Sequence, residues 1–106
     1  MHESERQRIA GYLGIAQRAG KIAAGDMAAR EALQRGKAYL LVLAADVSPK
    51  VKEELTGLAG ADVPLLVWPD KQELGRIVGK SRRGALALLD EGFARAIVKV
   101  LAEREQ

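Results

Sequence analysis

The sequence predicts an α/β protein, a sandwich in which helices cover both faces of one sheet. Three apolar runs, at residues 39–45, 63–67 and 85–89, have the length and composition of buried strands and are expected in the interior of that sheet. Segments with helical apolar spacing separate these runs. A chain of 106 residues that is 48% hydrophobic is expected to form one domain with its own core.

The stretch at residues 25–46 contains the central helix and strand of the prediction. Gly25 allows a sharp turn, and Asp26 either caps the helix that follows or lies favourably at its positive N-terminal end. Gly36 ends that helix in the left-handed conformation, beside the basic Arg35. The run at 39–45 then predicts a strand that is buried on both faces.

The N-terminal third of the chain begins with a predicted helix. Ser4 and the three residues after it have the form of a capping box, and Gly20 ends the helix. Residues 21–24 are expected to be extended. After the central strand, Ser48 is the predicted N-cap of a third helix, whose apolar stripe consists of Val51, Leu55, Leu58 and Ala59.

The second half of the chain is predicted to add two helices and a basic loop. Asp70 caps a short helix, with Glu73 completing a capping box, and Gly79 ends it. Residues 80–83 form the basic loop, and Asp90 opens the last helix. The tail at 103–106 is polar and is expected to fray.

Composition excludes several classes of function. The chain has no cysteine, which fits a reducing, cytoplasmic location and excludes thiolate metal sites. Its one histidine, His2, lies in a polar N-terminal tail, so neither histidine catalysis nor a metal site nor any other cofactor is expected. No apolar run approaches the roughly 18 residues of a membrane helix, and no signal peptide precedes the first helix.

Positive charge gathers in two separate segments, although the net charge is only +3. Residues 18–37 hold five basic residues against two acidic ones, and residues 71–84 hold five against one. These segments form one patch only if the fold joins them; solvated charges on unrelated faces are the commoner outcome. In the second segment, Lys80, Arg82 and Arg83 lie between two glycines and repel one another.

The motifs contain no set of residues typical of a catalytic site. The stretch from Gly75 to Ser81 has three residues between its glycines where a phosphate-binding P-loop has four, and it does not follow a strand. It is therefore not interpreted as a P-loop, although a single phosphate contact by Lys80 stays open. Asp46, Asp70 and Asp90 each follow a strand and are interpreted as turn and cap residues. Trp68 either stacks on a ligand base or forms the edge of the core.

An ordered set of motifs resembles the kink-turn-binding ribosomal-protein superfamily of the archaeal seven-A-e type. The chain is most similar to the short bacterial YlxQ-type members. The resemblance spans residues 9–100 and rests on these stretches: Leu13-Gly14-Ile15-Ala16-Gln17-Arg18-Ala19-Gly20-Lys21, then Gly25, Arg35-Gly36-Lys37-Ala38, Asp70-Lys71-Gln72-Glu73-Leu74-Gly75-Arg76, Gly79-Lys80 and Gly92-Phe93-Ala94.

The resemblance implies a three-layer α/β/α sandwich with a four-stranded mixed sheet and RNA binding without catalysis. Members of the family bind a sharply bent RNA through the start of the second helix and the loop after the fourth. Those two places coincide with the two positive segments. The implied RNA-binding residues here are Lys21, Gly25, Asp26, Met27, Arg30, Glu31, Arg76, Lys80, Ser81, Arg82 and Arg83.

The chain departs from the family pattern at the residues that recognise bases. The family's Asn-Glu pair falls on Met27 and Ala28, its helix lysine falls on Glu31 with Arg30 one position away, and its apolar-acidic-apolar loop falls on residues 80–82. Met27 and Ala28 cannot form the hydrogen bonds that recognise sheared base pairs. The features of the family's site that this chain retains are the N-terminus of the helix after Gly25 and a loop at 80–83 that is more basic than in the family; both favour binding of phosphate.

The sequence therefore favours binding of a structured RNA, with ribosomal RNA or a ribonucleoprotein among the candidates, and with no membrane partner and no specificity for DNA. The alternative is a protein-interaction module that has kept the fold and lost RNA binding. Whether the two basic segments meet on one surface distinguishes these hypotheses.

Overall fold

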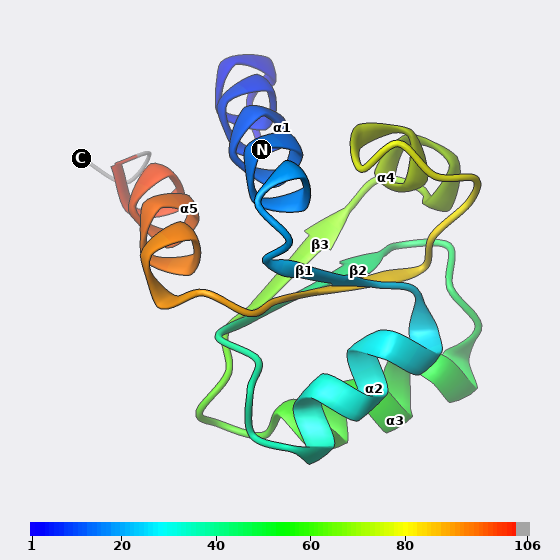
Figure 1. Cartoon of the computed structure of the whole chain (residues 1–106). Helices are drawn as coiled ribbons and strands as arrows, with labels where there is room; N and C mark the ends of the chain where they lie inside the picture. Colours follow the sequence, from blue (N-terminus) through cyan, green and yellow to red (C-terminus); the bar gives the residue numbers. More distant parts are fainter. Residues whose placement is uncertain (104–106) are drawn as a thin grey trace.

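The computed structural model describes residues 1–103 and has helices on both faces of a four-stranded mixed sheet (Figure 1). In chain order the elements are α1 (Glu3–Arg18), β1 (Ile22–Ala24), α2 (Asp26–Gln34), β2 (Leu40–Ala44), α3 (Pro49–Ala59), β3 (Leu65–Trp68), α4 (Lys71–Ile77), β4 (Ala85–Leu88) and α5 (Glu91–Glu103). The predicted α/β/α sandwich is thus confirmed. None of these helices is long and apolar enough to cross a membrane.

The sheet has the order β1-β4-β2-β3. Strand β4 lies between β1 and β2 and is antiparallel to both, whereas β2 and β3 are parallel. Every residue of β2 and β4 is buried, as their uninterrupted apolar sequences predict. The predicted interior strands at residues 39–45 and 85–89 are therefore confirmed. Strand β2 is one residue shorter than predicted at each end, and β4 is one residue shorter at its C-terminal end only.

Two apolar cores lie on opposite faces of the sheet. Helices α1, α4 and α5 cover one face, where Leu40, Val42 and Leu86 point toward them. Helices α2 and α3 cover the other, and Leu41 and Leu43 of β2 point toward that side. This division explains why β2 is apolar at every position.

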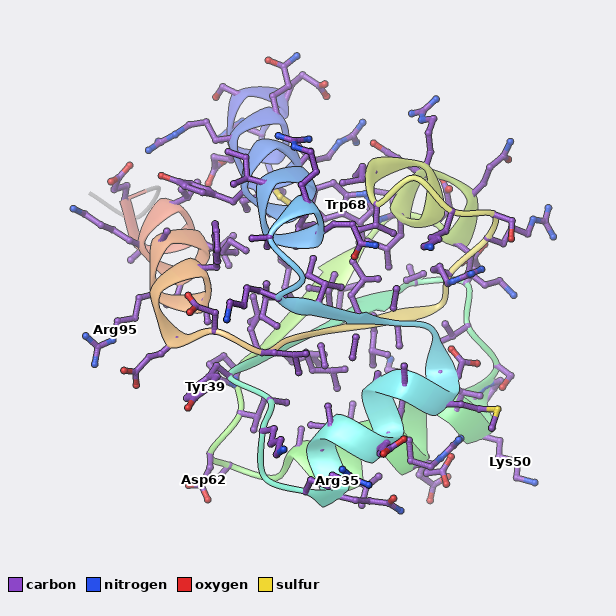
Figure 2. All side chains as sticks on the ribbon, in the orientation of Figure 1. Arg35, Tyr39, Lys50, Asp62, Trp68 and Arg95 are labelled. Atoms are coloured by element: carbon purple, nitrogen blue, oxygen red, sulfur yellow. The ribbon has the colours of Figure 1, made fainter. Side chains whose placement is uncertain are left out.

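Trp68 belongs to the larger core. Its side chain is fully buried, and Figure 2 shows it on the face of the sheet that α1 and α4 cover. Of the two predicted roles, stacking on a ligand base is therefore wrong and a core position is right. The burial is possible because residues in β3 alternate between the two faces.

Strand β3 lies at an edge of the sheet, so the predicted interior position of residues 63–67 is wrong. Leu66 and Trp68 are buried, but Leu65 and Val67 are 44% and 48% exposed on the other face. Helix α3 packs against α2 and leaves these two side chains partly uncovered. An apolar run alone does not distinguish an edge strand with one covered face from a central strand.

The structure corrects or refines three details of the predicted helices: the start of α1, the role of Asp26 and the apolar stripe of α3. Helix α1 starts before Ser4, with His2 at the N-cap, and the amide of His2 donates a 2.9 Å hydrogen bond to Glu5 Oε1. Gly25 is the N-cap of α2 and Asp26 is its first helical residue, so of the two predicted roles of Asp26 the cap is wrong and the position at the positive N-terminal end is right. Leu58 is 38% exposed and lies at the margin of the α3 stripe.

The other predicted ends agree with the structure. Ser48 and Asp70 cap α3 and α4 through hydrogen bonds of 3.3 Å from the amide of Val51 and 2.7 Å from the amide of Glu73. Asp90 Oδ2 accepts a hydrogen bond from the amide of Phe93 at the start of α5. The predicted fraying of the tail is wrong at Glu103, which is the last residue of α5 and accepts a 2.9 Å hydrogen bond from Arg8 at its Oε2; residues 104–106 lie outside the described part.

The alternation in β3 gives a matched pair of stability predictions. We expect Leu66→Ala to lower the free energy of unfolding by about 2–5 kcal/mol, because it leaves a cavity in the core. Leu65→Ala removes the same atoms from a side chain that is nearly half exposed, and it should cost less than about 1 kcal/mol. Urea denaturation followed by circular dichroism measures both; equal losses would contradict the assigned register.

Candidate nucleic-acid interface

Residues 24–28, from the first of the two basic segments, meet part of the second segment at one end of the sheet. The cations at this junction, Lys71, Arg82 and Arg83, all belong to the second segment. The basic loop, residues 80–83, lies on the connection from α4 to β4, beside the start of α2 (Figure 1). The amide of Gly25 donates a 2.8 Å hydrogen bond to the carbonyl of Ala85, and Ala44 donates one of 2.9 Å to Gly84. Strands β1 and β2 thereby hold the end of the loop in place.

An open groove of about 550 Å³ lies at this junction. Its α2 side consists of the end of β1 and the first helical residues, and its other side consists of the start of α4 and the basic loop. The residues that line it are Ala24, Gly25, Asp26, Met27, Ala28, Lys71, Arg82, Arg83 and Gly84.

Gly25 has a backbone conformation that only glycine adopts readily. Its φ is 111° and its ψ is 162°. The carbonyl of Gly25 accepts the first helical hydrogen bond, from the amide of Ala29 at 2.9 Å, and no side chain of the described residues caps the amides before it. The N-terminal end of α2 therefore presents backbone N–H groups and a positive dipole to this region.

The basic loop is packed directly on helix α4. The amide of Lys80 donates a 2.8 Å hydrogen bond to the carbonyl of Gly75, and the amide of Arg83 donates one of 3.1 Å to the carbonyl of Lys71. A Cβ at Gly75 would lie only 1.8 Å from the carbonyl oxygen of Ser81. The loop can therefore reach its position only because residue 75 has no side chain.

The groove carries more positive than negative charge. Lys71, Arg82 and Arg83 face a single acidic side chain, Asp26, and none of the three cations forms an ion pair with another residue in the range 1–103. The guanidinium of Arg83 instead donates hydrogen bonds to Ser81 Oγ at 3.1 Å and to the carbonyl of Arg82 at 2.9 Å. Its charge is held within the loop without being neutralised.

Five of the residues suggested by the sequence line the groove: Gly25, Asp26, Met27, Arg82 and Arg83. Lys80 and Ser81 are exposed in the same loop. Lys71 also lines the groove, although the sequence analysis did not select it as a site residue. It belongs to the second positive segment, but its position next to the Asp70 cap gave no indication that it faces the other segment.

The remaining suggested residues lie elsewhere. The carbonyl of Lys21 pairs with the amide of Leu89, so Lys21 lies at the end of β1 away from the groove. Glu31 forms a 2.9 Å ion pair with Arg35, the C-cap residue at the far end of α2 (Figure 2). Arg76 is near the end of α4, beside its acidic residue Glu73.

Arg30 is engaged with helix α3. Its Nη2 donates a 2.6 Å hydrogen bond to Glu54 Oε1, and this bond lowers the pKa of Glu54 and raises that of Arg30. Because Glu54 must be ionised to hold the arginine, the pair is intact at neutral pH and weakens as the pH falls through the lowered pKa of Glu54. Arg30 therefore points toward α3 and does not line the groove.

The described residues contain no group of three or more histidine, cysteine, aspartate or glutamate side chains that could hold a metal ion. The groove itself offers a ligand backbone amides, three cations, the carboxylate of Asp26 and a short apolar surface.

The fold matches solved structures closely. A Bacillus halodurans protein of unknown function has a TM-score of 0.82 and 29% sequence identity, with 89% of this chain and 96% of that chain covered. The Giardia lamblia 15.5kD RNA binding protein has a TM-score of 0.81 at 20% identity, with 99% of this chain and 91% of that chain covered. These similarities define the chain as a small α/β/α domain of a widely shared type.

The chain belongs to the ribosomal protein L7Ae/L30e/S12e/Gadd45 family, whose model matches residues 7–98. The RNA-binding protein YlxQ of Bacillus subtilis is 30% identical over 90 residues, which cover 84% of this chain and 90% of that protein. The large ribosomal subunit protein eL8 of Cenarchaeum symbiosum is 36% identical over 88 residues, which cover 81% of this chain and 70% of that protein. The family resemblance seen in the sequence is thus confirmed.

The contact between the basic loop and α4 predicts an unusual effect of Gly75→Ala. Within a helix, replacing glycine by alanine usually stabilises by up to about 1 kcal/mol. Here the new methyl group would overlap the carbonyl of Ser81, so we expect a loss of about 1–3 kcal/mol in the free energy of unfolding.

Gly57→Ala in α3 is the matched control, because nothing lies within 4 Å of a Cβ at that position. It should stabilise the protein or leave it unchanged. Urea denaturation of both variants checks the pair, and a Gly75→Ala variant as stable as Gly57→Ala would contradict the described packing of the loop.

Proposed function

We propose that this protein binds structured RNA, without catalysis, through the groove between the start of α2 and the basic loop. The observation that carries the proposal is the convergence there of Lys71, Arg82 and Arg83, which have no acidic partner among the described residues. Three cations that form no ion pair and share a groove with one carboxylate favour a polyanionic partner. The proposal is supported by relatives that are named RNA-binding protein YlxQ.

The proposed interface consists of a helix end and a loop with complementary roles. The amides at the start of α2 favour a phosphate group, and the side chains of Lys80, Arg82 and Arg83 supply most of the electrostatic affinity. Asp26, Met27 and Ser81 form the surface between them. Lys21, Arg30, Glu31 and Arg76 lie outside the groove, and we assign them at most secondary contacts with an extended RNA.

The proposed partner is a ribosomal RNA or another folded RNA of the cytoplasm, free or within a ribonucleoprotein. The eL8 and eL30 relatives are named as proteins of the large ribosomal subunit, which supports this class of partner. Phosphate contacts position an RNA but carry no direct sequence information, so its folded shape is expected to matter more than its sequence.

The salt dependence of binding tests the electrostatic part of the proposal. Each phosphate that a protein neutralises contributes about 0.7–0.9 to the slope of log affinity against log salt concentration. The triple variant Lys80→Ala, Arg82→Ala, Arg83→Ala should flatten that slope by roughly two units. The measurement is fluorescence anisotropy with a labelled ribosomal RNA fragment at several salt concentrations, with the fold verified by circular dichroism.

The control is Lys50→Ala, Lys52→Ala, Lys99→Ala, which removes three exposed lysines outside the groove. It should leave the slope nearly unchanged. If both triple variants weaken RNA binding equally, the affinity arises from positive charge spread over the whole surface, and the groove is not a specific site. If the loop variant binds RNA as well as the unaltered protein, the loop is not the binding site. If the unaltered protein itself does not bind RNA, the RNA proposal fails, and capture of a protein partner becomes the experiment for the interaction-module alternative.

Selectivity for kink-turn RNA is predicted to be weak. Met27 and Ala28 occupy the positions of the family's polar base-reading pair, and each missing bidentate contact forfeits about 1–3 kcal/mol of discrimination. The test compares a kink-turn RNA with the same duplex and bulge in which the sheared pairs are replaced by Watson–Crick pairs. A preference of a hundredfold or more, about 2.7 kcal/mol, would contradict the prediction.

A further inference from the structure

Strand β3 leaves one edge of the sheet open. The amide of Leu41 in β2 donates a 2.9 Å hydrogen bond to the carbonyl of Pro64, and Leu41 stands opposite Leu65 in the register of the two strands. Hydrogen bonds in a parallel pair go to alternate residues, so the amides and carbonyls of Leu65 and Val67 point away from β2. Among residues 1–103, no loop closes this edge with a backbone hydrogen bond.

The open edge is protected at its ends but not along its length. The strand sequence Leu-Leu-Val-Trp carries no charge, and the side chains of Leu65 and Val67 are nearly half exposed. Natural proteins usually place charged residues on such an edge, because it can pair with another chain. Pro64 and Pro69 flank the strand, and since proline has no N–H to donate, they prevent a paired strand from sliding past it.

The open edge is complementary to a second copy of itself. Leu65 and Val67 lie on either side of Leu66, so a two-fold axis at Leu66 places Leu65 of each copy opposite Val67 of the other. In an antiparallel pair, two opposite residues whose backbone groups face each other exchange both N–H···O bonds. All the outward amides and carbonyls of the two strands are then paired, and the exposed side chains pack in cross-strand contacts.

Charged residues beside the strand also fit a second copy. Asp62 and Lys99 line a hollow of about 430 Å³ at the start of β3. Asp70 and Lys71 come shortly after its end. Within residues 1–103, none of these four side chains forms an ion pair. An antiparallel pair brings the start of one strand beside the end of the other, so each end of the interface gains two cations and two carboxylates that balance.

We propose that the open edge of β3 is a docking surface for a second copy of this chain, which joins the two sheets into one across a two-fold axis. Each chain contributes only two half-exposed strand side chains and their backbone groups. The contact is thus smaller than the roughly 800 Å² per partner of a standard interface, so we expect a weak dimer with a dissociation constant on the order of 100 µM. This inference goes beyond the proposed function and does not require RNA.

Sedimentation velocity at protein concentrations from about 10 µM to about 1 mM, which bracket that constant, measures the dimer. Val67→Lys places a charge on the open edge and should weaken the dimer about tenfold or more. Ile15→Lys is the matched control, because Ile15 is as exposed as Val67 but lies on α1, and it should leave the dimer unchanged. Circular dichroism verifies the fold of both variants.

Disulfide crosslinking tests the register, since the chain has no cysteine of its own. A mixture of Leu65→Cys and Val67→Cys places cysteines on opposite residues, with Cα atoms about 5.5 Å apart, a distance that a disulfide spans. In either variant alone the two cysteines are diagonal neighbours, about 7–8 Å apart. Under mild oxidation the mixture should therefore form a covalent dimer about tenfold faster than either variant alone.

Each outcome decides the proposal. A protein that stays monomeric at about 1 mM overturns it, because even a small strand contact associates at that concentration. A dimer that Val67→Lys retains, or a cysteine mixture that crosslinks no faster than its components, also overturns it, because the copies then meet through another surface. If Val67→Lys does not fold, the cysteine mixture decides alone. None of these results bears on RNA binding, so failure here leaves the proposed function standing.

Discussion

The fold depends on one strand that is buried on both faces. Strand β2 pairs with β3 and β4 along its edges, and its side chains enter two separate cores. Because every residue of β2 is apolar and buried, the sheet requires helices on both of its faces. The connections that bring those helices into place also bring the start of α2 and the basic loop to the same end of the sheet.

The groove is therefore a consequence of the topology. Strand β4 is antiparallel to both β1 and β2, so it begins where those two strands end. The segment after β1 becomes the start of α2, and the segment before β4 is the basic loop. The start of α2 and the basic loop, about 50 residues apart in sequence, are brought together by backbone hydrogen bonds such as the one from the amide of Gly25 to the carbonyl of Ala85. The cations are added to a junction that the backbone hydrogen bonds already form.

Much of the architecture could be predicted from the sequence, and the errors have physical causes. Apolar periodicity and capping residues such as Ser48, Asp70 and Asp90 located the helices, because these patterns are local. The edge position of β3 could not be predicted, since it depends on which strands β2 and β4 pair with. Lys71 lines the groove although its local sequence did not indicate this, and Arg30, which the sequence suggested, does not line it. A side chain's direction across a tertiary junction, such as that of Arg30 toward Glu54, is not encoded in its local pattern.

The close contact at Gly75 has a consequence for how this family can diversify. Different residues determine the position of the groove and its chemistry. The backbone at Gly25 and Gly75 fixes where the helix end and the loop lie, whereas the side chains of Met27, Lys80 and Arg82 are exposed and belong to neither core. Exposed residues can be exchanged at little cost in stability. A chain with this framework can therefore acquire a new ligand by a few surface substitutions, while the scaffold that presents them is inherited unchanged.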